Sequence, residues 1–147
     1  MKNTHFLIAK DDSDVKTLSL GAFIAQIDGR KATSLKDFYQ ELSAAMRFPE
    51  TDSKSLEALD EMLNDLEWIQ EKKVIIYIEN SADWLIKEKS DEKLLSVLDI
   101  LDATAEDWKW MDEEEGTPQK ELQIIFQDSE RIRTLLEDQE IPFWVLS

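Results

Sequence analysis

The sequence predicts a three-layer α/β domain with a short, mainly parallel sheet and helices packed on both of its faces. Apolar runs at 22–28, 74–78 and 122–126 have the length and the β-branched content of buried strands. The run at 74–78 is apolar throughout, which is typical of a strand covered on both faces. Stretches with helical periodicity separate the runs, and strands joined by helical crossovers are parallel. A fourth strand is predicted to begin at Pro142, because proline is tolerated as the first residue of a strand.

Helices are predicted between these strands from their apolar spacing and their caps. The clearest runs from Leu35 to Met46, because Ser34 and Asp37 form a capping box and the apolar residues that follow repeat at helical spacing. Pro49 ends this pattern, since a residue before proline is pushed out of the helical region. Further helical segments are predicted at 55–68, at 91–105 and from Asp128 or Ser129 onward, with one or two helical turns at 82–86.

The N-terminal residues leave two interpretations open. The run from His5 to Ala9 is either a short strand or a loosely attached arm. The acids Asp11, Asp12 and Asp14 that follow lack the glycine and the distal glutamate of a calcium-binding loop. We therefore expect a solvated turn at this position, and a single domain over 1–147.

Charge is the strongest feature of the composition. The chain of 147 residues has 33 acidic and 17 basic residues, for a net charge of −16. Such a field repels nucleic acid, and it either favours basic protein partners or only confers solubility. There is no cysteine, and no apolar run approaches the roughly 18 residues of a membrane span. The N-terminus does not resemble a secretory signal, so we expect a cytoplasmic protein without nucleic-acid or membrane partners, monomeric when unbound.

Residues for catalysis are scarce. His5 is the one histidine in the sequence, so a Ser–His–Asp arrangement has almost nothing to build on. The three glycines are widely spaced and form no phosphate-binding loop. We expect no cofactor and no enzymatic activity. An enzyme using a carboxylate-bound metal is the alternative that so acidic a chain leaves open.

The stretch from Phe48 to Leu66 predicts an amphipathic helix after a proline-containing loop. Its leucines repeat at the spacing of a core-facing stripe. Polar and acidic residues fall on the opposite side: Glu57, Asp60, Glu61, Asn64 and Asp65. One interpretation is an ordinary surface helix, and the other is an acidic docking face.

The tryptophans divide in the same way. We expect Trp144 in the core, as is usual for tryptophan in an apolar run. Trp68 and Trp84 are either at the edge of the core or anchors of an interface, where tryptophan is enriched.

Several strings, taken in chain order, resemble the barstar family of acidic inhibitors of barnase-type ribonucleases. They are FIAQIDG, SLKDFYQELSAAMRFPE, SLEALDEML, VIIYIEN, SVLDIL and LQIIFQ, together spanning about Phe23 to Gln127. The resemblance implies a core of about 22–127, an N-terminal arm over 1–21, and a C-terminal extension of a helix and a strand over 128–147.

The resemblance also implies a function and a site. In the family, the second helix and the loop before it fill the active site of a basic ribonuclease, and their carboxylates replace the phosphates of the substrate. By position, Glu57 and Glu61 match the two acids of that helix. The candidate partner-binding residues are therefore Glu57, Glu61, Asp60, Asp52, Thr51, Ser53 and Trp68. The alternative partner is a basic protein other than a nuclease, bound by an immunity or adaptor protein.

Overall fold

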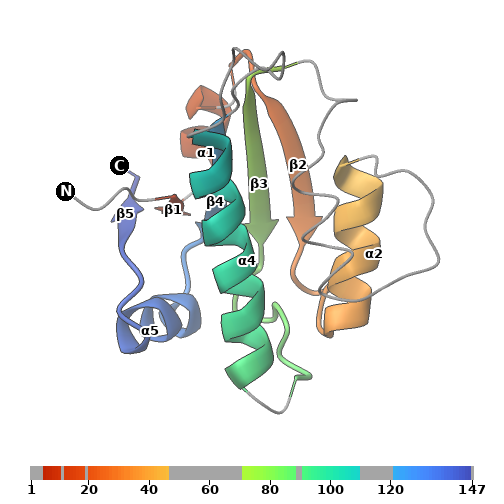
Figure 1. Ribbon diagram of the computed structural model, residues 1–147. Coiled ribbons are helices and arrows are strands. Elements are labelled where there is room, and N and C mark those ends of the chain that lie inside the picture. The colour runs from red at the N-terminus through yellow and green to blue at the C-terminus, as the bar shows by residue number, and fades with distance from the viewer. Residues whose placement is uncertain are drawn as a thin grey trace.

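The computed structural model describes residues 5–10, 12–18, 20–46, 71–88, 91–109 and 121–146. Five strands alternate with helices along this described part of the chain (Figure 1). In order they are β1 (Phe6–Ala9), α1 (Asp12–Leu18), β2 (Phe23–Asp28), α2 (Leu35–Met46), β3 (Lys73–Glu79), α4 (Asp91–Lys109), β4 (Glu121–Gln127), α5 (Glu130–Asp138) and β5 (Phe143–Val145).

The strands form one sheet in the order β2-β3-β4-β1-β5, and every pairing between them is parallel. The α/β class with a parallel sheet is thus confirmed, but the sheet has five strands rather than the predicted three with a C-terminal fourth. The additional strand is β1. It lies inside the sheet, where Phe6 is in register with Ile124 of β4 on one side and with Phe143 of β5 on the other. Of the two interpretations of His5 to Ala9, the strand is correct.

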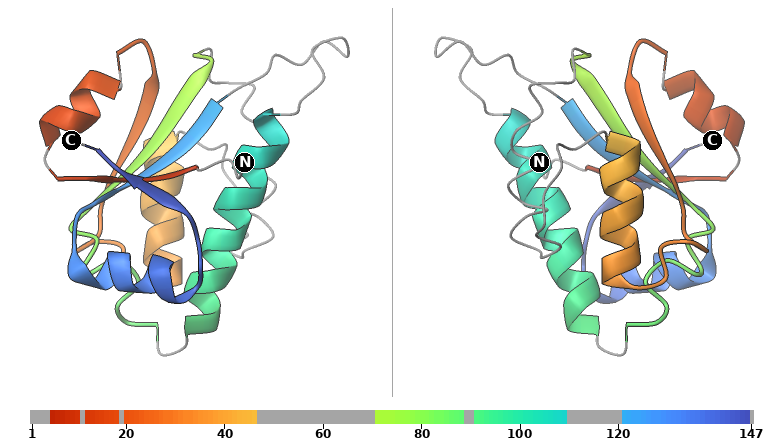
Figure 2. Two further views of the ribbon diagram at one scale, coloured as in Figure 1. Left: turned by 90° about the vertical axis from the view of Figure 1, so that its left-hand side faces the viewer. Right: turned by 90° about the vertical axis from the view of Figure 1, so that its right-hand side faces the viewer.

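Helices cover both faces of the sheet unequally (Figure 2). The connection from β1 to β2 runs across the sheet in one direction, and all later connections run in the other. Because such crossovers are right-handed, opposite directions place their helices on opposite faces. Accordingly, Val15 of α1 packs with Leu7, Ile75 and Tyr77 in a small cluster. Helices α2, α4 and α5 contribute to a larger cluster on the other face.

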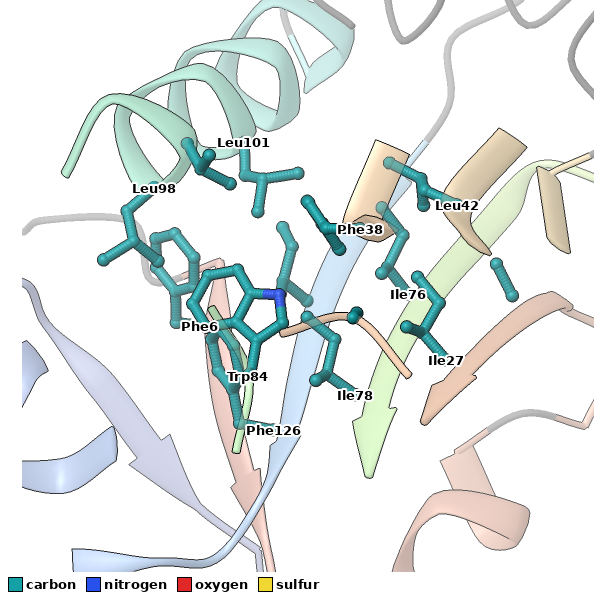
Figure 3. Close-up of a cluster of buried hydrophobic side chains, with 14 of the residues drawn as sticks. Phe6, Ile27, Phe38, Leu42, Ile76, Ile78, Trp84, Leu98, Leu101 and Phe126 are labelled. Atoms are coloured by element: carbon teal, nitrogen blue, oxygen red, sulfur yellow. The ribbon is translucent and has the colours of Figure 1, made fainter. Parts of the chain in front are cut away.

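Trp84 lies at the centre of the larger cluster (Figure 3). Its ring meets Phe38 edge-on at a centroid distance of 5.4 Å and Phe126 at 5.1 Å. Trp84 is fully buried, which resolves its two interpretations in favour of the core.

Three local predictions need correction. The segment predicted as a turn after Lys10 is the helix α1 from Asp12. Residues 81–87 form consecutive turns, with hydrogen bonds such as Trp84 N to Ser81 O at 3.3 Å, rather than helix. Trp144, predicted in the core, is 65% exposed, because β5 is an edge strand.

In contrast, α2 matches its predicted bounds, and Asp37 N donates to its predicted cap, Ser34 Oγ, at 3.2 Å.

Candidate functional site

The predicted partner-binding residues all lie in the segment 47–70, outside the described residues. They are Glu57, Glu61, Asp60, Asp52, Thr51, Ser53 and Trp68. Their contribution to binding therefore stays a prediction. The structure does describe the elements from which this segment departs and to which it returns: α2, which ends at Met46, and β3, which begins at Lys73.

Both of these elements are firmly packed. Helix α2 buries Phe38, Leu42 and Met46 in the larger cluster. Its first backbone N–H, on Leu35, donates to Glu88 Oε2 at 2.9 Å, which satisfies a group that the start of a helix leaves without a partner. This hydrogen bond and the ion pair with Lys93 keep the pKa of Glu88 below its usual value, against the opposing effect of burial. Strand β3 is buried from Val74 to Ile78 and is paired on both sides.

The segment 47–70 carries a concentrated negative charge. It contains seven carboxylates, at Glu50, Asp52, Glu57, Asp60, Glu61, Asp65 and Glu67, against two basic residues, Arg47 and Lys54. An acidic segment of this charge, placed between two buried elements, can attract a basic partner and raise its rate of encounter.

The carboxyl edge of the sheet is the other place where function is expected in such a fold, because open α/β sheets bind ligands where neighbouring connections leave on opposite faces. Here that point lies between β1 and β4, followed by α1 and α5. Asp128 N donates to Ala9 O at 2.8 Å across this point. Arg133 binds the carboxylate of Asp128 with both Nε, at 2.6 Å, and Nη2, at 3.1 Å. Arg133 thereby lowers the pKa of Asp128.

Hydrogen bonds between polar groups also link the carboxyl ends of β2, β3 and β4. Asp28 Oδ1 accepts hydrogen bonds from Asn80 Nδ2 at 2.8 Å and from Arg30 N at 3.0 Å. Burial acts to raise the pKa of Asp28, but these hydrogen bonds outweigh it and lower the pKa. Asn80 N donates in turn to Gln127 Oε1 at 2.6 Å. The polar groups of this edge therefore bind one another instead of pointing toward a ligand.

Ser81 extends this network to the start of α5. Its hydroxyl donates to Gln127 O and lies 2.8 Å from Ser129 Oγ, while Ser129 Oγ also caps α5 by accepting from Ile132 N at 3.2 Å. This carboxyl-edge network was not predicted from the sequence. The available signal was a polar residue at the end of β2, β3 and β4, namely Asp28, Asn80 and Asp128.

The one histidine lies at the opposite edge. His5 is 9% exposed, and its Nε2 lies 2.8 Å from Glu106 Oε2 of α4. Across the described ranges, no three His, Asp or Glu side chains are grouped so that they could hold a metal ion. None of the described helices is long and apolar enough to cross a membrane.

Comparison with known proteins identifies one family. Residues 22–146 match the family described as "Barstar (barnase inhibitor)". The match includes α5 and β5, which the sequence resemblance had placed beyond the family core. No curated protein matches the chain.

A solved structure, "Structure of the Aeropyrum Pernix ORC2 protein (ADPNP-ADP complexes)", is similar in fold, with a TM-score of 0.57. It covers 99% of this chain at 10% identity, whereas this chain covers 42% of that one. At this identity the likeness concerns the fold alone.

Proposed function

The chain belongs to the barstar family, and from this premise we propose that it inhibits a basic ribonuclease of the barnase type. The observation that carries the proposal is the family match, because it runs through the acidic segment 47–70. In this proposal, the carboxylates of Glu57 and Glu61 occupy the positions of substrate phosphates in the nuclease active site. Asp60 and Asp52 add negative charge around them, and Thr51, Ser53 and Trp68 contribute contacts.

Two further observations support binding over catalysis. The net charge of −16 suits a partner whose active site is built to attract RNA phosphates. At the carboxyl edge between β1 and β4, where an enzyme of this architecture would hold its substrate, Asp128 N donates to Ala9 O and the Asp128 carboxylate binds Arg133. In this proposal, the protein is therefore a stoichiometric inhibitor rather than an enzyme. It acts inside the cell that produces the nuclease.

The test is calorimetric titration of a barnase-type ribonuclease with the chain and with matched variants. We expect Glu57→Ala combined with Glu61→Ala to weaken binding by more than about tenfold, the change that 1.4 kcal/mol produces. The reason is that each substitution leaves a nuclease cation in the interface without its partner. Binding should also weaken as salt is raised from 0.1 to 1 M, where the Debye length falls from about 10 to about 3 Å.

The matched control removes two carboxylates from α5, which lies toward the β5 end of the sheet. Glu130 and Asp138 are exposed and lie in α5, which connects β4 and β5, whereas α2 and β3 hold the acidic segment. The variant Glu130→Ala with Asp138→Ala has the same net charge as the test variant. If both variants lose affinity equally, overall charge rather than the segment 47–70 determines binding, and the proposed site is wrong.

A further inference from the structure

Trp144 combines a large apolar side chain with high exposure. It is 65% exposed, and its neighbour Val145 is 37% exposed. Both belong to β5, which ends the sheet and pairs only with β1 within the described part of the chain. A tryptophan side chain can bury 150–250 Å² in a contact, so an exposed one at a sheet edge marks a candidate interaction surface.

The backbone of β5 also has hydrogen-bonding capacity at its outer edge. Val145 is in register with Ile8, and Leu146 N donates to Ile8 O at 2.8 Å. Successive residues of a strand direct their N–H and C=O groups to opposite sides. Trp144 and Leu146 therefore bond toward β1, while Phe143 and Val145 direct their backbone groups outward, where no strand of the described ranges pairs with them.

The short length of β5 is the main feature that opposes the addition of another strand. Natural edge strands are often protected by a lysine, a proline or a bulge, and the sequence FWV contains none of these. Its length of three residues limits a new ladder to a few hydrogen bonds. Side-chain contacts and charge must therefore supply much of the affinity and the specificity.

Three exposed carboxylates lie just before this edge. Glu137 and Asp138 are in the last turn of α5, and Glu140 is in the turn that follows, with φ of 56°. Negative charge at a helix C-terminus is unfavourable because it faces the negative end of the helix dipole. The nearby cation, Arg133, binds Asp128 and interacts more weakly with Glu137, so it offsets only part of this negative charge. These acids thus weaken α5 and create a local field suited to a basic ligand.

From these observations the geometry points to β5 as a docking edge for an extended, basic segment of a partner protein. The segment adds to the sheet beside β5, hydrogen-bonds to Phe143 and Val145, and places an apolar side chain against Trp144. Its lysines or arginines face Glu137, Asp138 and Glu140. A second copy of this chain is disfavoured because both copies carry a net charge of −16. The proposal is independent of nuclease inhibition, because α2 and β3 lie toward the other end of the sheet.

The test uses two synthetic peptides that differ only in charge. One is an alternating threonine-valine hexapeptide with two lysines at each end, and the other has two glutamates at each end. Amide NMR of the full chain should show that the lysine peptide slows hydrogen exchange at Phe143 and Val145 and shifts the signals of Trp144. The glutamate peptide should bind at least tenfold more weakly.

Two variants separate docking from folding. Val145→Pro removes an outward N–H and leaves the hydrogen bonds to β1 in place, so it should keep the thermal stability of the chain and reduce peptide affinity at least tenfold. Trp144→Thr removes the ring and should reduce affinity as well. Equal binding of the two peptides, undiminished binding by a folded Val145→Pro variant, or no change at β5 with the lysine peptide would overturn the proposal. Concentration-dependent protection of Val145 without peptide would assign the edge to a second copy instead.

Discussion

Gly29 and Gly21 offer a matched test of how the carboxyl edge is assembled. A Cβ added at Gly29 would lie 2.7 Å from Glu79 O and closer still to Asn80 O, both of them backbone atoms that cannot move aside cheaply. It would also strain the hydrogen bond from Gly29 N to Glu79 O, now 2.7 Å. Overpacking costs about 1–3 kcal/mol and a lost hydrogen bond about 0.5–1.5 kcal/mol. Gly29→Ala should therefore destabilise the fold by about 1.5–4.5 kcal/mol.

Gly21 supplies the contrast, because its φ of +75° is unfavourable for other residues but a Cβ there would meet no atom within 4 Å. The left-handed conformation costs about 1–2 kcal/mol, partly offset by about 0.4–1 kcal/mol from a less flexible unfolded chain. Chemical denaturation of both variants gives the two free energies. A loss from Gly21→Ala equal to or larger than that from Gly29→Ala would refute the view that close backbone contact joins β2 to β3 at this edge.

The remaining predictions concern the core and two carboxyl groups. Trp84→Ala should cost about 3–5 kcal/mol in chemical denaturation, but Trp84→Phe less than about 2 kcal/mol, because it also removes an indole N–H that has no hydrogen-bond partner among the described residues. Asp128 has a lowered pKa, so it stabilises the fold above its unfolded pKa, and this contribution is lost as the pH falls through the folded pKa. In thermal unfolding, Asp128→Asn should therefore be destabilising at pH 7, and progressively less so as the pH falls below the unfolded pKa. The pKa of Asp102 is raised by partial desolvation and by Glu106 and Asp99, against an opposing effect of His5. Its favourable contribution to stability is therefore lost as the pH rises through the folded pKa. Asp102→Asn should raise the thermal midpoint at pH 7 but not at pH 3.

The sequence predicted an element correctly where several independent local signals favoured that element. Helix α2 combines a cap at Ser34 with regular apolar spacing, and its predicted bounds match the structure. Strand β3 was predicted from an unbroken apolar run, which is typical of a strand covered on both faces. In both cases, local propensity and burial favour the same element.

Errors occurred where the outcome depends on strand order. Strand β1 has four residues and gives no periodicity that separates an interior strand from an arm, yet it lies between β4 and β5. Trp144 was predicted in the core from its apolar neighbours, but an edge position leaves its ring exposed. Helix α1 has seven residues and an acidic start that also suits a turn. The candidate site rests on family resemblance and charge, because Glu57 and Glu61 lie outside the described residues.

We propose that this member of the barstar family blocks a basic ribonuclease, and that it does so through the acidic segment 47–70. The most direct test of this proposal is the rate of RNA hydrolysis by a barnase-type ribonuclease during titration with the chain. Activity should fall to zero at one equivalent, and Glu57→Ala with Glu61→Ala should prevent this loss at the same concentrations. Unchanged hydrolysis in an excess of the chain, or full inhibition by the double variant, would refute the proposal.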